Sequence, residues 1–155
     1  MFVRKAINAD IPVLNSLLRQ VLEVHHTGRP DIFKGGAKKY TDEQLSAILA
    51  DALSPVFVAE EEGQVYGYAF CQLQEFSGHN IMQDCKTLYI DDLCVDEDAR
   101  GKKIGSLLFD YVKQYAKEQG CYNLTLNVWS CNYSAAKFYE KMGLKPQKTY
   151  LESIL

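Results

Sequence analysis

The segment Leu93–Leu108, with the sequence LCVDEDARGKKIGSLL, restricts the possible folds more than any other part of the chain. It indicates the end of an apolar strand, an acidic turn, a basic glycine-bearing loop and the start of an amphipathic helix. A strand, a glycine loop and a helix in this order form a phosphate-binding geometry, because the first helical amides lack partners and the helix dipole favours an anion. The apolar face of the helix comprises Ile104, Leu107, Leu108, Tyr111, Val112, Tyr115 and Ala116.

This loop differs from two familiar phosphate-binding motifs. The chain contains neither G-x-x-x-x-G-K-[ST], which holds nucleoside triphosphates, nor G-x-G-x-x-G, which holds dinucleotides. Arg100, Lys102 and Lys103 bring mobile positive charge, and Gly101 and Gly105 allow an anion to approach the backbone. A plain helix start with solvated lysines has the same pattern, so the loop alone does not decide between the two.

The composition indicates a single domain spanning residues 1–155. The 155 residues, 47% of them hydrophobic, suffice for one sizeable core. The net charge of −3 gives no reason to expect a nucleic acid or a membrane surface as partner, and no apolar run is long enough to span a bilayer. The N-terminus, MFVRKAINAD, lacks the pattern of a signal peptide. Five cysteines without a C-x-x-C pair indicate reduced thiols and a cytoplasmic location.

The hydrophobic pattern predicts one mixed, mostly antiparallel sheet flanked by helices, an α/β (α+β) fold. Polar caps define the helix starts: Asp10 for the first helix, a capping box of Thr41 and Gln44 for the second, and Asn132 for the last. The second helix is expected to run until Pro55, with Leu53 facing inward. The expected strands cover 2–7, 56–60, 65–73, 87–95, 123–128 and 147–155.

The glycine loop and its flanks resemble a known enzyme family. Arg100 and Gly105 stand at the first and last positions of Q/R-x-x-G-x-G/A, motif A of the GNAT superfamily of N-acetyltransferases, and Lys103 replaces the usual middle glycine. The resemblance extends through DDLCVD before the loop and NVWSCNYSAAKFYEKMGL after it, and the order of elements fits the GNAT fold along the chain. It implies direct transfer of the acetyl group of acetyl-CoA, in a ternary complex, to a primary amine of a small molecule or protein.

The resemblance also implies where acetyl-CoA would bind. The loop would hold its pyrophosphate, and the strand end would meet its pantetheine arm and its thioester carbonyl through backbone groups. Two asparagines near the last helix would add hydrogen bonds. The implied contacts are Leu93, Cys94, Val95, Arg100, Gly101, Lys102, Lys103, Ile104, Gly105, Ser106, Asn127, Asn132 and Tyr139. No metal is expected, because His25 and His26 have no partnered Cys/His cluster.

Asp91 and Asp92 stand inside an apolar strand, where carboxylates are costly unless they are paired or near water. Since successive residues of a strand face opposite sides, only one of them is expected to point at a given site. The resemblance to diamine-acetylating members favours Asp91 as a base or as an anchor for a cationic amine, with Asp92 as the second choice. Alternatively, one aspartate caps a neighbouring backbone group and neither is catalytic.

Tyr139 ends the sequence NYSAAKFY, which resembles the N-x-x-A-x-x-F-Y element of the family. In that element the tyrosine hydroxyl points at the sulfur of coenzyme A and can protonate the departing thiolate, a sensible task for a phenol. The structural alternative is that Tyr139 and Phe138 are core aromatics and that Asn132 only caps the helix.

The acceptor site is less well defined by the sequence. In the family it is built from the first helix and nearby loops, which indicates His26 near the end of the first helix and Asp31 and Phe33 in the polar loop 27–39, with Trp129 as a pocket wall. For any single one of these residues, an ordinary structural role is the competing interpretation. The sequence does not name the amine, and it leaves a homodimer open.

Two other functions fit the sequence. A GNAT-like module could sense acetyl-CoA without turnover, an option that Lys103 in the glycine motif raises and that the candidate catalytic residues oppose. Cys94 with His25 or His79 could form a cysteine hydrolase. No cationic neighbour in sequence is present to lower the pKa of the Cys94 thiol, so a packed core thiol is the better interpretation.

Overall fold

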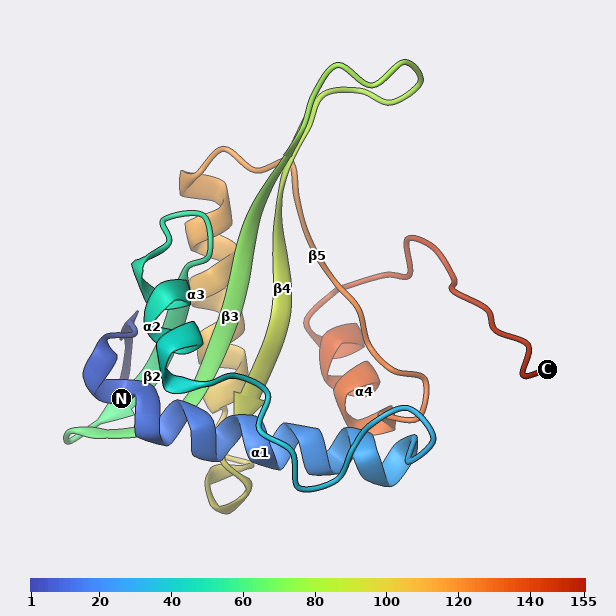
Figure 1. Cartoon of the computed structure of the whole chain (residues 1–155). Helices are drawn as coiled ribbons and strands as arrows, with labels where there is room; N and C mark the ends of the chain where they lie inside the picture. Colours follow the sequence, from blue (N-terminus) through green and yellow to red (C-terminus); the bar gives the residue numbers. More distant parts are fainter.

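The computed structural model describes all 155 residues and shows one five-stranded sheet with helices on both faces (Figure 1). The strands lie in the order β1-β2-β3-β4-β5; the first four are antiparallel neighbours, and β5 runs parallel to β4. The predicted mixed, mostly antiparallel sheet is therefore confirmed. The elements are β1 Phe2–Lys5, α1 Ile11–Gly28, α2 Asp42–Ala50, β2 Val56–Glu61, β3 Gln64–Phe76, β4 Cys85–Val95, α3 Ile104–Glu118, β5 Asn123–Leu126 and α4 Tyr133–Lys141, with single 3-10 turns at Asn8–Asp10 and Glu97–Ala99.

Two apolar cores lie on opposite faces of the sheet because alternate strand residues point in opposite directions. In β2, Val56 and Val58 join the core under α1 and α2, while Phe57 joins the core under α3 and α4. Leu14 in α1 and Val112 in α3 are completely buried in these two cores. Burying each such side chain contributes about 1.5–3 kcal/mol, so the two helices are held firmly on the sheet that carries the site.

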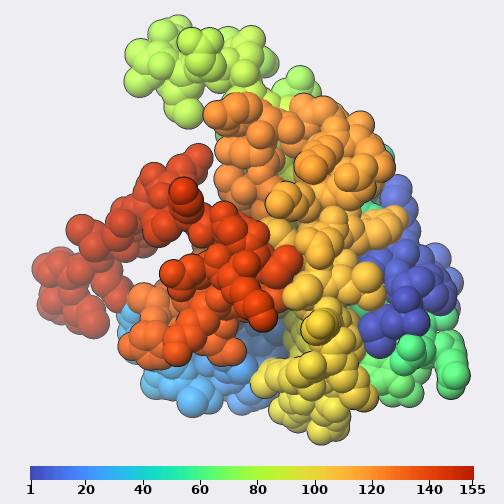
Figure 2. Space-filling view, turned by 180° about the vertical axis from the view of Figure 1, so that it is seen from behind, coloured from blue at the N-terminus to red at the C-terminus, as the bar shows by residue number.

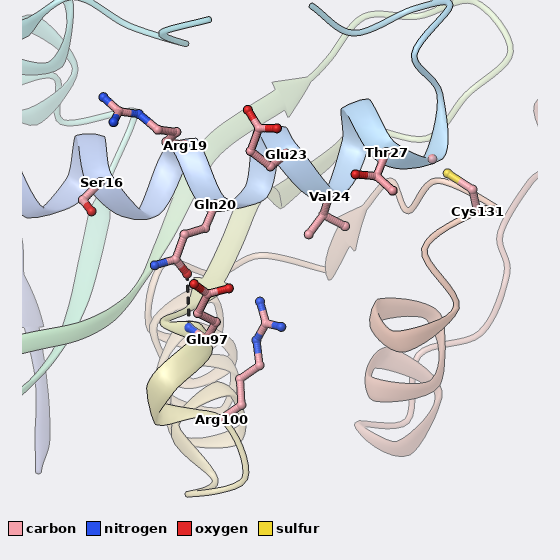
Figure 3. A pocket seen from close by; sticks show the side chains of 10 residues that line it. Ser16, Arg19, Gln20, Glu23, Val24, Thr27, Glu97, Arg100 and Cys131 are labelled. Atoms are coloured by element: carbon pink, nitrogen blue, oxygen red, sulfur yellow. Dashed lines mark hydrogen bonds between the residues drawn. The ribbon is translucent and has the colours of Figure 1, made fainter. Parts of the chain in front are cut away.

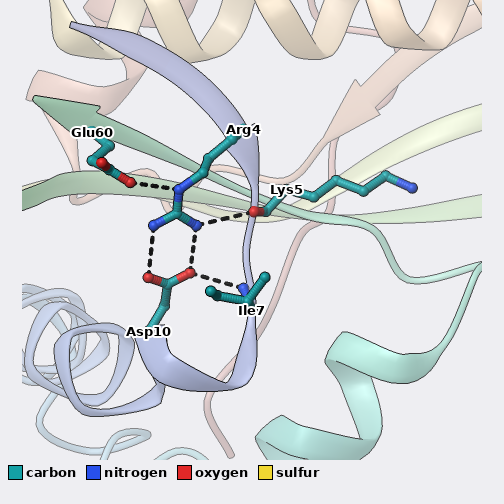
Figure 4. Close-up of polar contacts among 5 residues, drawn as sticks. All are labelled: Arg4, Lys5, Ile7, Asp10 and Glu60. Carbon is teal, nitrogen blue, oxygen red and sulfur yellow. Dashed lines mark hydrogen bonds and ion pairs between the residues drawn. The ribbon is translucent and has the colours of Figure 1, made fainter. Parts of the chain in front are cut away.

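A cluster of charges joins β1, β2 and the start of α1 (Figure 4). The guanidinium of Arg4 donates to both oxygens of Asp10, at 2.7 and 2.9 Å, and to Glu60 at 2.5 Å. The Asp10 carboxylate also accepts the backbone N–H of Ile7 at 2.8 Å. Burial by itself raises the pKa of Asp10, but Arg4 and the Ile7 N–H outweigh it and hold that pKa below its usual value. Asp10 occupies the cap position, yet its side chain makes no capping bond to α1, so the capping role expected from the sequence is wrong.

The second helix matches its predicted start but not its predicted end. The capping box is confirmed: Thr41 N–H donates to Gln44 at 2.8 Å, and Gln44 N–H donates to the Thr41 hydroxyl at 3.2 Å. The helix ends at Ala50, because the carboxylate of Asp51 accepts the N–H of Leu53 at 2.9 Å and forms a turn instead. Leu53 is consequently exposed rather than inward-facing.

The strand expected over 147–155 is absent. The last helix α4 is followed by Gly143 with a positive φ of 88°, and the chain after it forms no regular element. A strand needs a neighbour for its backbone groups, and this segment pairs with no other strand, which leaves β5 at the edge of the sheet. Figure 2 shows this segment, in red, and the tip of the β3–β4 hairpin, in light green, projecting from the body. None of the helices combines the length and the apolar character needed to cross a membrane.

Candidate active site

A β-bulge in β4 places two carboxylates on the same side. Phe70 of β3 pairs with Asp92, and the next residue, Cys71, pairs with Ile90, so Asp91 is an extra residue without a partner. A bulge breaks the alternation of side chains along a strand. Asp91 and Asp92 can therefore both reach one cation, and the expectation that only one of them points at a given site is wrong.

That cation is the ammonium of Lys39, which lies in the segment between α1 and α2. Its nitrogen is 3.2 Å from a carboxylate oxygen of Asp91 and 3.2 Å from one of Asp92. The sequence did not single out Lys39, because nothing within its own segment shows that it meets residues more than fifty positions later. The group Asp91–Lys39–Asp92 carries two negative charges and one positive charge.

The two carboxylates differ in their exposure. The side chain of Asp92 is 9% exposed and that of Asp91 is 29% exposed. Burial raises the pKa of Asp92, and the positive charge of Lys39 offsets only part of this rise. Burial alone would lower the pKa of Lys39, but the charges of Asp92 and Asp91 outweigh it and raise that pKa. A raised pKa suits a carboxylate that accepts a proton near neutral pH. The environment of Asp92 thus fits a base and that of the more exposed Asp91 an anchor, the reverse of the sequence-based preference, and both roles stay a prediction.

Strand β4 has an open edge directly beyond the carboxylates. Strand β5 pairs with β4 only from Thr87 to Ile90, where the pairing ends at Leu126. From Asp91 to Val95, β4 continues without a partner on that side, while the chain after β5 turns away toward α4 (Figure 1). Leu93, Cys94 and Val95 thus lie on a strand edge whose backbone groups face no neighbouring strand, which suits an extended ligand.

The glycine loop forms an uncapped helix start. Gly101 has a φ of 83°, and Lys103, the residue before α3, has a φ of 63° and a ψ of 16°. Lys103 thus adopts the left-handed conformation that glycine would adopt freely, at a cost of about 1–2 kcal/mol. No side chain caps α3, so the first amides of this helix, at Ile104, Gly105 and Ser106, remain available for an anion. The side chain of Ile104 is buried in the core, and only its backbone can take part.

A groove with a volume of about 590 Å³ runs between α1 and this loop (Figure 3). Arg100 points from the loop toward α1, and the N–H of Glu97 donates to the side-chain oxygen of Gln20 at 3.1 Å. Gly28 of α1 and Cys131 both line the groove and lie close together: a side-chain carbon at Gly28 would stand 2.6 Å from the Cys131 sulfur. Its wall is formed by Ser16, Arg19, Gln20, Glu23, Val24, Thr27, Gly28, Glu97, Arg100 and Cys131. The sequence indicated Arg100 but not the α1 residues, which carry no local motif.

Tyr139 of α4 packs against the apolar core that α3 covers. Its ring centroid lies 5.2 Å from that of Phe138 and 6.4 Å from that of Phe109. Burial raises the pKa of Tyr139, and the negative charge of Asp92 acts in the same direction, so the phenol keeps its proton at neutral pH. Gly105 fits against the same helix: a side-chain carbon there would stand 3.3 Å from Phe138. A larger residue at Gly105 would therefore press on Phe138 of α4, apart from any contact with a ligand.

The two candidate asparagines have partners within the chain. The side chain of Asn132 accepts the N–H of Ala135 at 3.1 Å and caps α4, as the sequence predicts. The amide of Asn127 donates to the hydroxyl of Tyr89 at 3.1 Å. Both residues lie on the segment that diverges from β4, and their contacts with a cofactor stay a prediction.

Three aromatic rings gather at the C-terminal end of α1, around His25. The ring of Phe33 lies 5.0 Å from that of His25 and 5.1 Å from that of Trp129, measured between centroids. Burial lowers the pKa of His25, while the nearby charge of Asp92 opposes this shift. The structure therefore brings Phe33 and Trp129 together, although they are 96 positions apart in the sequence.

The other two acceptor candidates hold the loop in place. His26 contacts the backbone oxygen of Phe33 through its Nδ1 at 2.7 Å. Asp31 is exposed and pairs with Arg29 at 2.8 Å, and Arg29 also pairs with Glu152 of the C-terminal segment. These contacts give both residues a structural role in shaping the loop, and contact with an acceptor stays a prediction.

Cys94 does not have the environment of a nucleophile. It is buried under α1, with its sulfur 3.7 Å from the carbonyl oxygen of Leu17. Burial raises the pKa of the Cys94 thiol to about 12. His79 lies in the β3–β4 hairpin loop, where its Nδ1 accepts the N–H of Ile81 at 3.3 Å. A thiol with so little thiolate at neutral pH is a poor nucleophile, which argues against a cysteine hydrolase.

The chain is similar to known acetyltransferases over most of its length. Residues 19–144 match the model of the acetyltransferase (GNAT) family. The chain is 31% identical to the uncharacterized N-acetyltransferase YhfO of Bacillus subtilis (strain 168) over 157 aligned positions, which cover 100% of this chain and 97% of YhfO. It is 33% identical over 103 residues to a glucosamine 6-phosphate N-acetyltransferase of Arabidopsis thaliana, covering 66% of this chain but only 64% of the plant protein.

A solved structure gives the same result for the fold. A mutant form of the BH1408 protein from Bacillus halodurans superposes with a TM-score of 0.96 and 33% identity, over 100% of this chain and 99% of that protein. The superposition includes the bulged strand, the glycine loop and the last helix, because it spans the whole chain.

Proposed function

The chain belongs to the GNAT acetyltransferase family, and on that premise we propose that it moves the acetyl group of acetyl-CoA to a primary amine by direct transfer in a ternary complex. The acceptor is a small molecule or a protein amine. One observation carries this proposal: two carboxylates converge on a single ammonium nitrogen where β4 loses its partner strand.

The residues that would hold acetyl-CoA fit its chemistry. The uncapped amides at the start of α3 and the side chain of Arg100 suit a pyrophosphate. The open edge of β4 at Leu93–Val95 suits the amide-bearing pantetheine arm, with Asn127 and Asn132 on the opposite side. Acetyl-CoA, when bound, supplies an acetyl group activated as a thioester.

Four groups of the chain would then divide the work of the transfer. Asp91 holds the incoming amine as an ammonium ion, and Asp92, whose pKa is raised by burial, accepts its proton. A backbone N–H of Leu93–Val95 polarises the thioester carbonyl. Tyr139, whose hydroxyl keeps its proton until charge develops, gives that proton to the departing thiolate.

The chemistry of the acceptor follows from its surroundings. Two carboxylates favour a cationic amine, and the rings of Phe33 and Trp129 provide an apolar or cation-binding wall. The plant relative is named for glucosamine 6-phosphate, so amino sugars form the first acceptor class to test, followed by diamines, amino acids and aminoglycosides.

The proposal is tested by free-thiol release from acetyl-CoA against a panel of these amines. We expect amine-dependent thiol release by the wild-type chain and strongly reduced release by Asp92→Asn. The matched control is Asp96→Asn, which changes an equally charged residue that caps the 3-10 turn after β4. A module that only senses acetyl-CoA would bind it in calorimetry and release no thiol with any amine.

Oligomeric state and location complete the proposal. The outer edge of β5 pairs with no strand, and the C-terminal segment exposes the apolar side chains of Tyr150, Leu151 and Ile154. An open edge and an apolar segment favour pairing between two copies of the chain, so a homodimer is expected in analytical ultracentrifugation. A monomer at all concentrations would exclude it. A cytoplasmic location fits the five free thiols.

A further inference from the structure

The position of Lys39 is fixed by the residues that follow it along the chain. The ring of the next residue, Tyr40, stacks on Phe70, with centroids 6.1 Å apart and an interplanar angle of 27°. Phe70 is the β3 residue that pairs with Asp92. Thr41 then starts α2 through its capping box with Gln44. The backbone of Lys39 is thus anchored beside the bulge, and its ammonium also lies 5.3 Å from the ring centroid of Tyr40.

The adjacent lysine has a different environment. Lys38 pairs with Asp42 at 2.7 Å, and the side chains of this pair are 53% and 62% exposed. Lys39 instead places its nitrogen between the carboxylates that the proposed function gives to the acceptor amine. Of two consecutive lysines, Lys39, whose side chain is 36% exposed, contacts both carboxylates of the site, and Lys38 lies outside the site.

We propose, on the basis of the proposed function, that Lys39 is a self-acetylation site: its ε-amine stands where the acceptor amine would stand and accepts an acetyl group within the same chain. The geometry that points to it is a primary amine already held by both Asp91 and Asp92 beside the open edge of β4.

The step balances in atoms and charge. A bond forms between Nζ of Lys39 and the carbonyl carbon of the acetyl group, and the carbon–sulfur bond of the thioester breaks. The ammonium gives up two protons in all: one passes to Asp92 and then to water, and the other replaces the proton that Tyr139 gives to the departing thiolate. The products are N-acetylated Lys39, free coenzyme A and one released proton.

Only the neutral amine can attack. Because the charges of Asp92 and Asp91 raise the pKa of Lys39, the neutral fraction is small near pH 7. The charged and titratable groups that face this amine are the two carboxylates of β4, His25 of α1 and Tyr40. Self-acetylation is therefore slow at neutral pH and rises about tenfold per pH unit below that pKa. Acetylation removes the positive charge of Lys39 and leaves an amide in the place of the acceptor. This amide would block the binding of external amines.

The experiment incubates the full chain with acetyl-CoA alone, without an acceptor, and measures acetylation of each lysine by peptide mass spectrometry. We expect acetyl-Lys39 to form at least tenfold faster than acetyl-Lys38, which reports non-enzymatic acetylation of the same segment. Tyr139→Phe should slow the acetylation of Lys39 and leave the acetylation rate of Lys38 unchanged. In a mixture of unlabelled wild type and ¹⁵N-labelled Tyr139→Phe, transfer within one chain should acetylate Lys39 rapidly only in the unlabelled polypeptide.

Several results would overturn the inference. Equal rates at Lys38 and Lys39 would show chemical acetylation only, and equal labelling of both polypeptides would show transfer between molecules. Either result leaves amine-dependent thiol release, and with it the proposed function, intact. The loss of both thiol release and Lys39 acetylation would remove the two proposals together.

Finally, wild type preincubated with acetyl-CoA should lose turnover with external amines in proportion to acetyl-Lys39, whereas Lys39→Arg should show no such time-dependent loss.

Discussion

Replacing Tyr139 by phenylalanine removes one hydroxyl and keeps the ring. The packing of that ring on Phe138 and Phe109, at 5.2 and 6.4 Å, should survive, so the melting temperature should change little. If the hydroxyl protonates the thiolate, kcat should fall by about 10²–10⁴. At 1.36 kcal/mol per tenfold change, this corresponds to about 3–5 kcal/mol of transition-state stabilisation. The affinity for acetyl-CoA in calorimetry should stay close to that of the wild type.

The assay compares acetyl-CoA with an acetyl donor whose thiol is more acidic. A more acidic thiol leaves without help from an acid, so the defect of Tyr139→Phe should shrink with that donor. Tyr115→Phe is the matched control: its ring packs on Phe57, 5.0 Å away, in the same core but on α3, and its kcat should be unchanged. A defect of equal size with both donors would refute the acid role and indicate that the hydroxyl only positions the site.

Three further predictions concern the acceptor loop, the glycine loop and acid stability. In steady-state kinetics, Phe33→Ala should raise the acceptor KM and leave the acetyl-CoA KM nearly unchanged. Asp31→Ala should raise the acceptor KM by a smaller factor, because the Asp31 carboxylate forms an ion pair with Arg29. Lys103→Gly should preserve acetyl-CoA affinity in calorimetry and not lower the melting temperature, since glycine adopts the positive φ of 63° without strain. Asp10, whose pKa is lowered in the folded state, stabilises the fold fully above about pH 4 and loses this contribution as pH falls through its folded pKa. In urea titrations, the free energy of unfolding of Asp10→Asn should therefore depend less on pH below about pH 4 than that of the wild type.

The elements that follow local rules could be predicted from the sequence. The 3.6-residue pattern of α3 and the capping box of α2 depend on residues three or four positions apart. Both elements are present, although Leu107 and Tyr111 of the expected apolar face of α3 are exposed. The cap of α4 by Asn132 is also confirmed. The order of elements along the chain followed from the hydrophobic pattern and from the resemblance, and the five strands expected before 147 are present, with no boundary shifted by more than three residues.

The features that depend on distant partners could not be predicted. The bulge at Asp91 arises from its register with β3, and no local pattern distinguishes a bulged strand from a regular one. The contact between Lys39 and the two aspartates joins residues 52 and 53 positions apart. The segment 147–155 shows the converse error: its composition allows a strand, but a strand forms only where a neighbouring edge accepts its backbone groups.

The most direct test of the account is the pH dependence of acceptor kcat/KM at saturating acetyl-CoA, for Asp92→Asn against Asp91→Asn. Each variant removes one carboxylate and one contact with Lys39, so the second controls for the first. If Asp92 accepts the amine proton, the loss in Asp92→Asn should be largest at low pH and shrink as free amine becomes abundant. Asp91→Asn should mainly raise the acceptor KM at all pH values. A constant ratio of Asp92→Asn to wild-type rate across pH would contradict the assignment of Asp92 as the base.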